Sequence, residues 1–277
     1  MELDEIAYSK ADGVARIVLN RPDRLNPISA RPGGTRDQIL WGLADAQADP
    51  EIGAVLIHGA GKAFSAGGDI TGNKPRETPF EQAQFIDGAE RFHRAIRECA
   101  LPVIAAVHGY CFGAALSLVA SCDIVIAGTS ASFSLPEGRL GLVGVSPLVT
   151  VVGRQWAKFM MFSGEPINAE LARQIGLVLT IEPDDDLIER AADLGSRLSR
   201  LPREALTLTK KGIDAIADAA GDQAGRTVAA MSDSLVLANS PRANAPDGRP
   251  FREIIATEGM EGMKKARAAQ YSTPWLR

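Results

Sequence analysis

The first residues of the chain show the alternating apolar and polar pattern that is typical of β-strands. Residues 6–9 and 14–19 are short β-type runs, and Asp12-Gly13 lies between them, a pair that favours a tight hairpin turn. After a Pro-Gly-Gly breaker at residues 32–34, apolar side chains recur at helical spacing. The pattern therefore predicts a β-hairpin, a helix over residues 35–48 and a buried strand over residues 54–57.

The middle of the chain alternates helical and strand-like patterns. A polar, glycine-containing loop follows the strand at residues 54–57, and beyond it Phe85, Phe92 and Ile96 share one face of a predicted helix. Such alternation is typical of an α/β core. The expected elements are a helix over residues 80–99 and strands over residues 103–107, 123–127 and 132–135.

The segment from residue 101 to residue 122 has no formally charged side chain and is long enough to span a bilayer. A membrane span is disfavoured because Pro102 opens the segment, residues 108–113 have the composition of a turn, and Asp123 follows directly. A strand, a glycine-rich turn, a short buried helix and a second strand explain the segment better.

The pattern changes near residue 195, after which helical periodicity dominates and no strand pattern remains. The stretch at residues 239–250 is a loop by composition, because Asn, Pro and Gly recur in it. We therefore divide the chain into a core over residues 1–200 and a helical module over residues 201–277. The predicted helices of that module are residues 205–219, 223–237 and 259–269.

Composition excludes several classes of protein. The chain has 277 residues, of which 45% are hydrophobic and 23% are charged, as is typical of a folded globular protein and not of a disordered one. Lys and Arg total 30 against 34 Asp and Glu, and the resulting net charge of -4 lacks the basic excess that binding to phosphate backbones requires. Nucleic acid is therefore not an expected partner.

The cysteines and the amino terminus bear on the cellular compartment. Cys99, Cys111 and Cys122 cannot all pair with one another and form no CxxC motif, so neither a disulfide scaffold nor a zinc site is expected. The first residues carry acidic side chains where a secretory signal needs positive charge. These features favour a reducing, cytoplasmic location and no bound metal.

One glycine-containing loop invites a phosphate-binding interpretation. Gly59-Ala60-Gly61-Lys62 follows a predicted strand, yet it lacks the first glycine and the hydroxyl residue of a Walker loop and the last glycine of a dinucleotide fingerprint. A nicotinamide-dependent dehydrogenase remains an alternative that rests on these residues alone.

Two other glycine-containing turns are better candidates for chemistry. Residues 64–70 follow a buried strand, and residues 108–115 lie between a strand and the start of a helix. Small side chains there let a ligand approach the main chain, and free N–H groups at such turns can stabilise an enolate or a tetrahedral oxyanion. The alternative is that both segments are tight turns with no ligand.

Several motifs occur together in one order and spacing. Taken jointly, they resemble the crotonase superfamily, which contains the enoyl-CoA hydratases and isomerases, over about residues 6–215. No motif is specific alone, but their shared order is. The motifs are residues 19–26, 62–70, 102–110, 122–124, 133–137, 163–164, 175–178 and, more weakly, 257–262.

The resemblance implies an α/β fold, a spiral of ββα units with a helical carboxy-terminal module that serves as an oligomerisation and lid element. It also implies a homotrimer or a homohexamer. The substrate class it implies is acyl-CoA thioesters, as in fatty acid metabolism, with coenzyme A as part of the substrate and no tightly bound cofactor.

The resemblance also assigns roles to individual residues. In the family, two backbone N–H groups hold the thioester oxygen, and by motif position these belong to Gly68 and Ala114. Ala66 resembles the position whose carbonyl meets the adenine of coenzyme A, and Arg24 a basic position near its phosphates, although Arg24 is also explained as a solvated loop charge. The remaining expected substrate-binding residues, next to the two donors, are Asp69 and Gly113.

The sequence departs from the family at the catalytic carboxylates. Hydratases of the family use two glutamates, of which the second corresponds to Glu137, while the first falls on Ser117. Ser117 can donate and accept a hydrogen bond but cannot act as a base near neutral pH, so proton transfer would rest on Glu137. Glu137 could also be an exposed turn carboxylate. Further departures are Thr71, Gly144-Val145 and a lengthened loop at residues 241–255.

One base suits double-bond isomerisation, in which a proton leaves C2 and returns at C4. We therefore expect an enoyl-CoA isomerase, with Glu137, Gly68, Ala114 and Ser117 at the catalytic centre. An enoyl-CoA hydratase is the close alternative, and decarboxylation, thioester hydrolysis or C–C cleavage are more distant ones. Ser117 also leaves open a catalytically degenerate relative that only binds coenzyme A, RNA or a protein partner.

Overall fold

The computed structural model describes all but a few short stretches of the chain. The described residues are 3–69, 78–140, 148–221, 224–225, 227–228, 231–232, 244–245, 247–269 and 274–276. Thr71, Gly144-Val145 and most of the predicted helix at residues 223–237 lie outside them.

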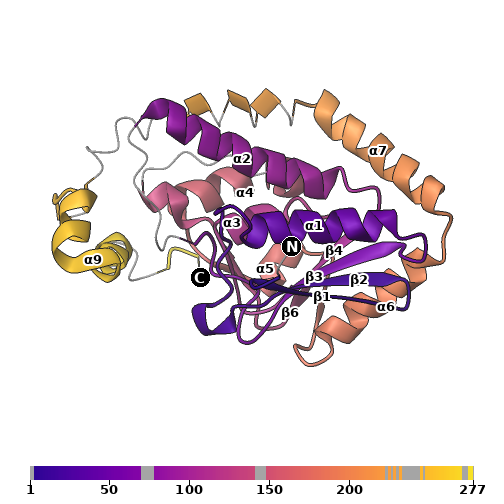
Figure 1. Cartoon of the computed structure of the whole chain (residues 1–277). Helices are drawn as coiled ribbons and strands as arrows, with labels where there is room; N and C mark the ends of the chain where they lie inside the picture. The colour runs from indigo at the N-terminus through magenta and orange to yellow at the C-terminus, as the bar shows by residue number, and fades with distance from the viewer. Residues whose placement is uncertain are drawn as a thin grey trace.

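A six-stranded sheet forms the centre of the molecule (Figure 1). Its first two strands pair as an antiparallel hairpin, and each later strand adds in parallel to its neighbour. The strands, in spatial order, are β1 (Ile6–Ala11), β2 (Val14–Leu19), β3 (Ala54–Gly59), β4 (Val103–Val107), β6 (Ile124–Gly128) and β9 (Thr180–Glu182).

A second, three-stranded sheet branches off where β4 ends. Its strands are very short, and its first strand pairs in parallel with the second, which pairs antiparallel with the third. The strands are β5 (Tyr110–Phe112), β7 (Ser132–Ser134) and β8 (Ile167–Asn168).

Helices cover both faces of the large sheet and extend beyond it (Figure 1). In Figure 1, α7 and α9 lie at opposite ends of the molecule. The described helices are α1 (Thr35–Ala48), α2 (Pro79–Arg97), α3 (Ala114–Val119), α4 (Leu148–Ser163), α5 (Ala169–Gln174), α6 (Leu187–Ser199), α7 (Arg203–Ala219) and α9 (Phe251–Ala268), with 3-10 turns η1 (Pro22–Arg24) and η2 (Pro136–Leu140).

Side-chain alternation along the strands separates two apolar layers. Ile17 and Ile57 point into the main core, which also contains apolar side chains of α1, α2 and α3. Leu56 and Ile104 point to the other face, where they pack with Leu187 of α6. The turns at the carboxyl ends of β3 and β4 are therefore held between well-packed layers.

Most of the predicted elements are confirmed. Asp12 and Gly13 form the hairpin turn, with φ angles of 52° and 77° in the left-handed region that this dipeptide favours. The α/β class is confirmed as well, and α1 and β4 cover the predicted residues. The two patterns are informative because β4 is a short apolar run that is buried at every position, and α1 buries residues at helical spacing along one face.

Three predictions of local structure are wrong. β5 lies inside the predicted turn at residues 108–113, because a three-residue strand between two glycines is too short to show a strand period. β8 and β9 have no counterpart among the predicted strands, for the same reason of length. α9 begins at Phe251, so residues 251–255 are helical where the sequence predicts a loop, and Ile254 is buried against Met263.

The apolar segment at residues 101–122 forms β4, β5 and α3, as the strand–turn–helix interpretation predicts, apart from the short strand in the turn. Within the described ranges, no helix is long and apolar enough to cross a membrane.

Candidate functional site

The loop after β3 runs between two other segments and is bonded to both. Ser65 pairs with Cys111 of β5, and Gly68 pairs with Ile28, each through a parallel bridge. Ile28 donates its N–H to the Gly67 carbonyl at 2.8 Å, and Asp69 donates its N–H to the Ile28 carbonyl at 2.9 Å. The loop is therefore anchored to a neighbouring segment on each side by a single bridge.

This bonding determines the direction of the Gly68 N–H. The peptide bond between Gly67 and Gly68 is trans, so its carbonyl and its N–H point to opposite sides. Because the Gly67 carbonyl points at Ile28, the Gly68 N–H points away from Ile28. Gly68 is exposed whereas Gly67 is buried, so a ligand can reach the Gly68 N–H.

The second predicted turn presents its N–H in a similar way. Gly113 has φ 57° and ψ -123°, donates its own N–H to the Ser134 carbonyl at 2.8 Å, and accepts the Ser117 N–H at 3.1 Å. The Gly113 carbonyl thus points along α3, and the N–H of Ala114 points out of the helix start, where it has no intrahelical acceptor. Within the described part of the chain, neither this N–H nor that of Gly68 donates a hydrogen bond.

The two turns meet at these N–H groups. A Cβ added at Gly67 would lie 3.8 Å from the Ala114 nitrogen, and one added at Gly68 would lie 3.9 Å from the Ala114 Cβ. Ala114 and Ser117 are the two residues of α3 that are not buried, and their spacing places them on one face of the helix. The structure therefore brings together Gly68, Ala114 and Ser117, as the sequence predicts.

Glu137 reaches the same place from η2. A Cβ added at Gly113 would lie 2.5 Å from Glu137 Oε1, so the carboxylate packs directly on the Gly113 Cα. Ser117 follows Gly113 by one helical turn. A carboxylate, a hydroxyl and two backbone N–H groups thus surround one small region, which is the arrangement that proton transfer next to a polarised carbonyl needs.

The turn that carries Glu137 is supported by the end of α4. A Cβ added at Gly138 would lie 1.9 Å from the Met161 carbonyl oxygen, so this position requires glycine for close backbone packing. Arg139 donates to the Ser163 carbonyl, and the Ser134 hydroxyl donates to the Gly164 carbonyl at 2.8 Å. Residues 161–164, at the end of α4, therefore hold in place both the turn that carries Glu137 and Ser134, whose carbonyl accepts the Gly113 N–H.

Arg267 of α9 interacts electrostatically with Glu137. Burial lowers the pKa of the Arg267 guanidinium, and the negative charge of Glu137 acts on that pKa in the opposite direction. The sequence analysis assigns no role to Arg267, because a single basic residue on an amphipathic helix is normally a solvated side chain.

The residues expected to bind coenzyme A lie beside Gly68. Asp69 is 10% exposed and pairs with Arg21 at 2.9 Å and, more loosely, with Arg24 at 3.8 Å. Ala66 is exposed and donates its N–H to the Leu25 carbonyl at 2.9 Å. The structure thus groups Arg24, Ala66 and Asp69, and it adds Arg21, to which the sequence analysis assigns no role.

The glycine loop at residues 59–62 has a packing explanation. A Cβ added at Gly59 would lie 2.4 Å from the Ala63 carbonyl oxygen, and Gly61 has φ 75°. The buried Asn26 donates from Nδ2 to the Ala60 carbonyl at 2.8 Å and to the Ala63 carbonyl at 2.9 Å. These glycines are required for a tight turn closed by Asn26.

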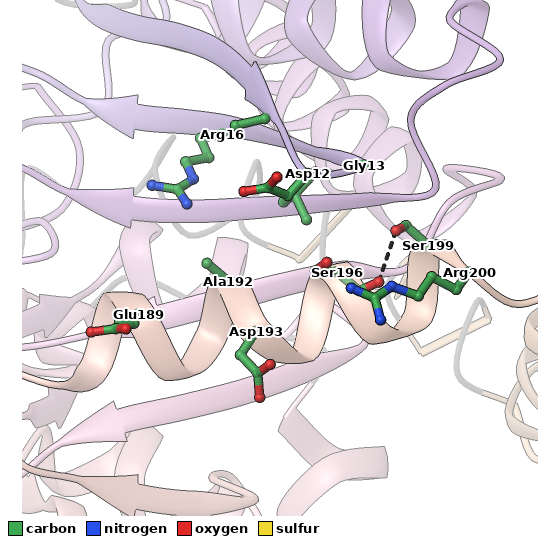
Figure 2. Close-up of a pocket in the computed structure, with 11 residues that line it drawn as sticks. Asp12, Gly13, Arg16, Glu189, Ala192, Asp193, Ser196, Ser199 and Arg200 are labelled. Carbon is green, nitrogen blue, oxygen red and sulfur yellow. Dashed lines mark hydrogen bonds between the residues drawn. The ribbon is translucent and has the colours of Figure 1, made fainter.

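Two cavities lie away from the predicted site residues. One, of about 650 Å³, lies between the β1–β2 hairpin and α6, where Arg16 and Arg200 line it together with Ser196 (Figure 2). The other, of about 460 Å³, lies beside α7 and contains the Lys210–Asp123 ion pair. No group of His, Cys, Asp and Glu suited to a metal ion occurs in the described portion of the chain.

Comparison with known proteins gives consistent matches along most of the chain. A family model for enoyl-CoA hydratase/isomerase matches residues 9–243. The chain is 33% identical over 215 residues to the 2,3-dehydroadipyl-CoA hydratase of Escherichia coli, covering 76% of this chain and 82% of that protein. It is 32% identical over 219 residues to the short-chain-enoyl-CoA hydratase of Clostridium acetobutylicum, covering 77% and 82%.

A solved structure has the same architecture. The crystal structure of an enoyl-CoA hydratase/isomerase from Xanthobacter autotrophicus Py2 matches with a TM-score of 0.88 at 27% identity, and the match covers 98% of this chain and 100% of that one.

Proposed function

The chain belongs to the enoyl-CoA hydratase/isomerase family, and from this premise we propose that it moves the double bond of an enoyl-CoA from the β,γ to the α,β position. Enzymes of the family act on coenzyme A thioesters. The observation that carries the proposal is the contact of one carboxylate, Glu137, with the Gly113 turn, while Ser117 stands at the motif position of the first of the two family glutamates.

In the proposed reaction one carboxylate does both proton transfers. Glu137 removes a proton from C2 of the 3-enoyl thioester, and the electron pair moves onto the thioester oxygen to give a dienolate. The N–H groups of Gly68 and Ala114 stabilise the negative oxygen as it forms. Glu137 then returns the proton to C4, and the carbonyl re-forms with the double bond between C2 and C3.

Ser117 contributes no base in this scheme. Its hydroxyl lies one helical turn beyond Gly113 and can donate a hydrogen bond to the Glu137 carboxylate or to the substrate. The carboxylate that removes the proton from C2 also returns it to C4, so isomerisation does not require a second carboxylate.

The coenzyme A portion is proposed to lie along the loop that contains Ala66 and Gly68. Ala66 would meet the adenine through its carbonyl, Arg24 would meet the phosphates, and Asp69 and Gly113 would border the thioester. Arg24 is 47% exposed next to Asp69, a position suited to an anionic group that arrives from solvent. The scheme needs no tightly bound cofactor, and coenzyme A enters as part of the substrate.

Hydration of a 2-enoyl-CoA is the second candidate, because the matched relatives are named as hydratases. It requires a water molecule positioned at C3, with Glu137 as base and Ser117 as the orienting group. The same oxyanion donors serve both reactions. Hydration differs from isomerisation in that Ser117 must orient a water molecule for attack at C3.

We also propose that the protein is a homotrimer or a homohexamer and that residues 201–277 form its oligomerisation and lid module. The support is α7, on which Leu208, Ile213 and Ile216 are 67%, 65% and 73% exposed. Apolar side chains on an exposed helix are typical of an interface. Light scattering that gave a monomer would contradict this assembly.

A cytoplasmic, reducing location is proposed from the thiols. Cys99, Cys111 and Cys122 are free, and burial raises the pKa of each thiol above its ordinary value. Protonated, buried thiols are inert and need no oxidising compartment.

A panel of 2-enoyl-CoA and 3-enoyl-CoA thioesters tests the proposal. Isomerisation of a 3-enoyl-CoA creates the conjugated thioester and raises its ultraviolet absorbance, whereas hydration of a 2-enoyl-CoA lowers it. We expect the absorbance to rise with 3-enoyl substrates at a kcat/KM above that of any hydration. Rapid hydration with no isomerisation would assign the protein to the hydratases instead.

A further inference from the structure

A chain of charged side chains lies behind the Gly68 loop. Glu5 is 3% exposed and lies 3.2 Å from Nη2 of Arg21, whose Nη1 lies 2.9 Å from Oδ2 of Asp69. Arg21 is itself mostly buried, and the same Nη2 donates to the Pro27 carbonyl. Buried charges are retained only when they are paired and hydrogen-bonded, as these are.

The contacts of Arg21 fall on both sides of one bridge. Pro27 directly precedes Ile28, and Asp69 directly follows Gly68, and Ile28 and Gly68 are the bridged pair. The planar guanidinium therefore connects the two segments whose hydrogen bonds direct the Gly68 N–H.

Glu5 fixes the orientation of Arg21 from the other side. Its carboxylate accepts the Thr35 N–H at 2.7 Å, the Thr35 hydroxyl and the Arg31 Nε at 3.0 Å. The network thus connects the start of α1 through Arg21 to Asp69, and every member except Arg31 is largely shielded from solvent.

We propose that Arg21 is a positioning residue for the reaction, and that it aims the Gly68 N–H at the thioester oxygen by clamping the two segments of the Ile28–Gly68 bridge. The inference rests on the proposed function. The loop needs such a clamp because Gly67 and Gly68 adjoin each other, and two successive glycines leave the backbone with much conformational freedom. Oxyanion stabilisation depends on donors that are oriented before the reaction begins.

In this proposal Asp69 helps to hold Gly68 in position. Its carboxylate is directed to Arg21, and its N–H to Ile28, so both ends of the residue hold the loop. Lysine cannot replace Arg21 in this role, because an ammonium is a point charge and cannot span the Asp69 carboxylate and the Pro27 carbonyl as a fork does.

The test compares Arg21→Met and Arg21→Lys with Arg31→Met, using the full-length protein and a bound enoyl-CoA. Arg31→Met is the matched control, because it removes an arginine from the same Glu5 carboxylate without touching Pro27 or Asp69. The readouts are kcat, KM, melting temperature and the carbonyl stretching frequency of the bound thioester, which falls when oxyanion donors polarise the carbonyl.

We expect both Arg21 variants to lower kcat by roughly ten- to a hundredfold with little change in KM, since a small misplacement of a catalytic group has effects of this size. The carbonyl shift should shrink in both variants and stay complete in Arg31→Met. Rescue of kcat and of the shift by lysine would overturn the inference, because it would show that charge alone suffices.

Two further outcomes distinguish a failure of the proposed role of Arg21 from a failure of the proposed oxyanion site. A native carbonyl shift in folded Arg21→Met would overturn the role of Arg21 and leave the proposed function intact. Absence of any shift in the unmodified protein would overturn the oxyanion site and the inference with it. If Arg21→Met does not fold, Asp69→Asn keeps the side-chain shape, and we expect a smaller decrease of kcat and of the shift; unchanged values would again overturn the inference.

Discussion

The two candidate oxyanion donors are held by different kinds of interaction. Gly68 lies on a loop whose direction depends on a parallel bridge and on buried ion pairs around Arg21. Ala114 follows Gly113, whose position depends on a backbone hydrogen bond to Ser134 and on close packing against Glu137. One donor is oriented by charge and the other by steric fit.

The difference predicts how each side responds to substitution. Close packing tolerates very little added volume, because interiors are filled and strain is transmitted to neighbours. An ion-pair network around an arginine is instead sensitive to the loss of the bidentate guanidinium. The Gly113 side should therefore lose both stability and activity when it is changed, and the Gly68 side should lose mainly activity.

Gly113→Ala should have the largest effect on the two properties together. The added Cβ would meet Glu137 Oε1 at 2.5 Å, and a backbone with φ 57° and ψ -123° disfavours alanine by about 1–3 kcal/mol. We expect a lower melting temperature and a loss of kcat of about a hundredfold or more, because Glu137 must move away. Thermal denaturation and steady-state assays measure both quantities.

Gly88→Ala is the control for that substitution. Gly88 lies in α2, and a Cβ added there meets no atom within 4 Å. We expect this variant to gain about 0.5–1 kcal/mol of stability from helix propensity and to keep its kcat. Equal behaviour of the two variants would contradict the steric account of the Gly113 turn.

Gly68→Val separates the N–H donor from the fold. Gly68 is exposed, lies outside the left-handed region, and has the Ala114 Cβ as its nearest Cβ contact at 3.9 Å. The variant keeps the N–H but crowds the approach of the thioester oxygen, so kcat should fall by about a hundred- to a thousandfold at a nearly unchanged melting temperature. Near-normal kcat in the folded variant would count directly against this donor.

The neighbouring Gly67 provides the opposite pattern. A Cβ at Gly67 would lie 2.8 Å from the Phe112 carbonyl oxygen at φ 109°, so Gly67→Ala should lose stability as well as kcat. Substitution of Gly67 should therefore lower both stability and activity, as at Gly113, whereas substitution of the adjacent Gly68 should lower mainly activity.

Ser117→Ala should have the smallest effect if one carboxylate moves the proton. Removing a hydrogen-bonding hydroxyl costs about 1 kcal/mol, which corresponds to less than about tenfold in kcat. If Ser117 orients a water molecule for hydration, hydration of 2-enoyl-CoA should fall much more than isomerisation of 3-enoyl-CoA. Parallel assays of the two reactions in this variant therefore distinguish the two candidate functions.

Much of this site could be predicted from the sequence. The glycine turns at residues 64–70 and 108–115 stand out as local patterns, the family resemblance assigns Gly68, Ala114, Ser117 and Glu137 to one site, and the structure brings these residues together. The α/β core follows from periodicity for the same reason, since its strands bury continuous apolar runs.

The supports of the site could not be predicted in the same way. Arg21 and Glu5 are charged residues near the amino terminus, and only the three-dimensional structure shows that the folded chain buries them behind Asp69. Glu165 likewise becomes a buried acceptor for the N–H groups of Trp275 and Leu276, a contact across 110 and 111 positions of sequence. Long-range polar contacts leave no periodic pattern in a single sequence.

The most direct measurement of the central claim is the activity of Glu137→Gln on its best 3-enoyl-CoA substrate, together with calorimetric binding of the same thioester. Glutamine fills the same space against Gly113 but cannot take a proton, so we predict a loss of kcat on the order of 10²–10⁴-fold while thioester binding is retained. Substantial turnover by the folded variant would contradict the account, because the proton would then be moved by another group.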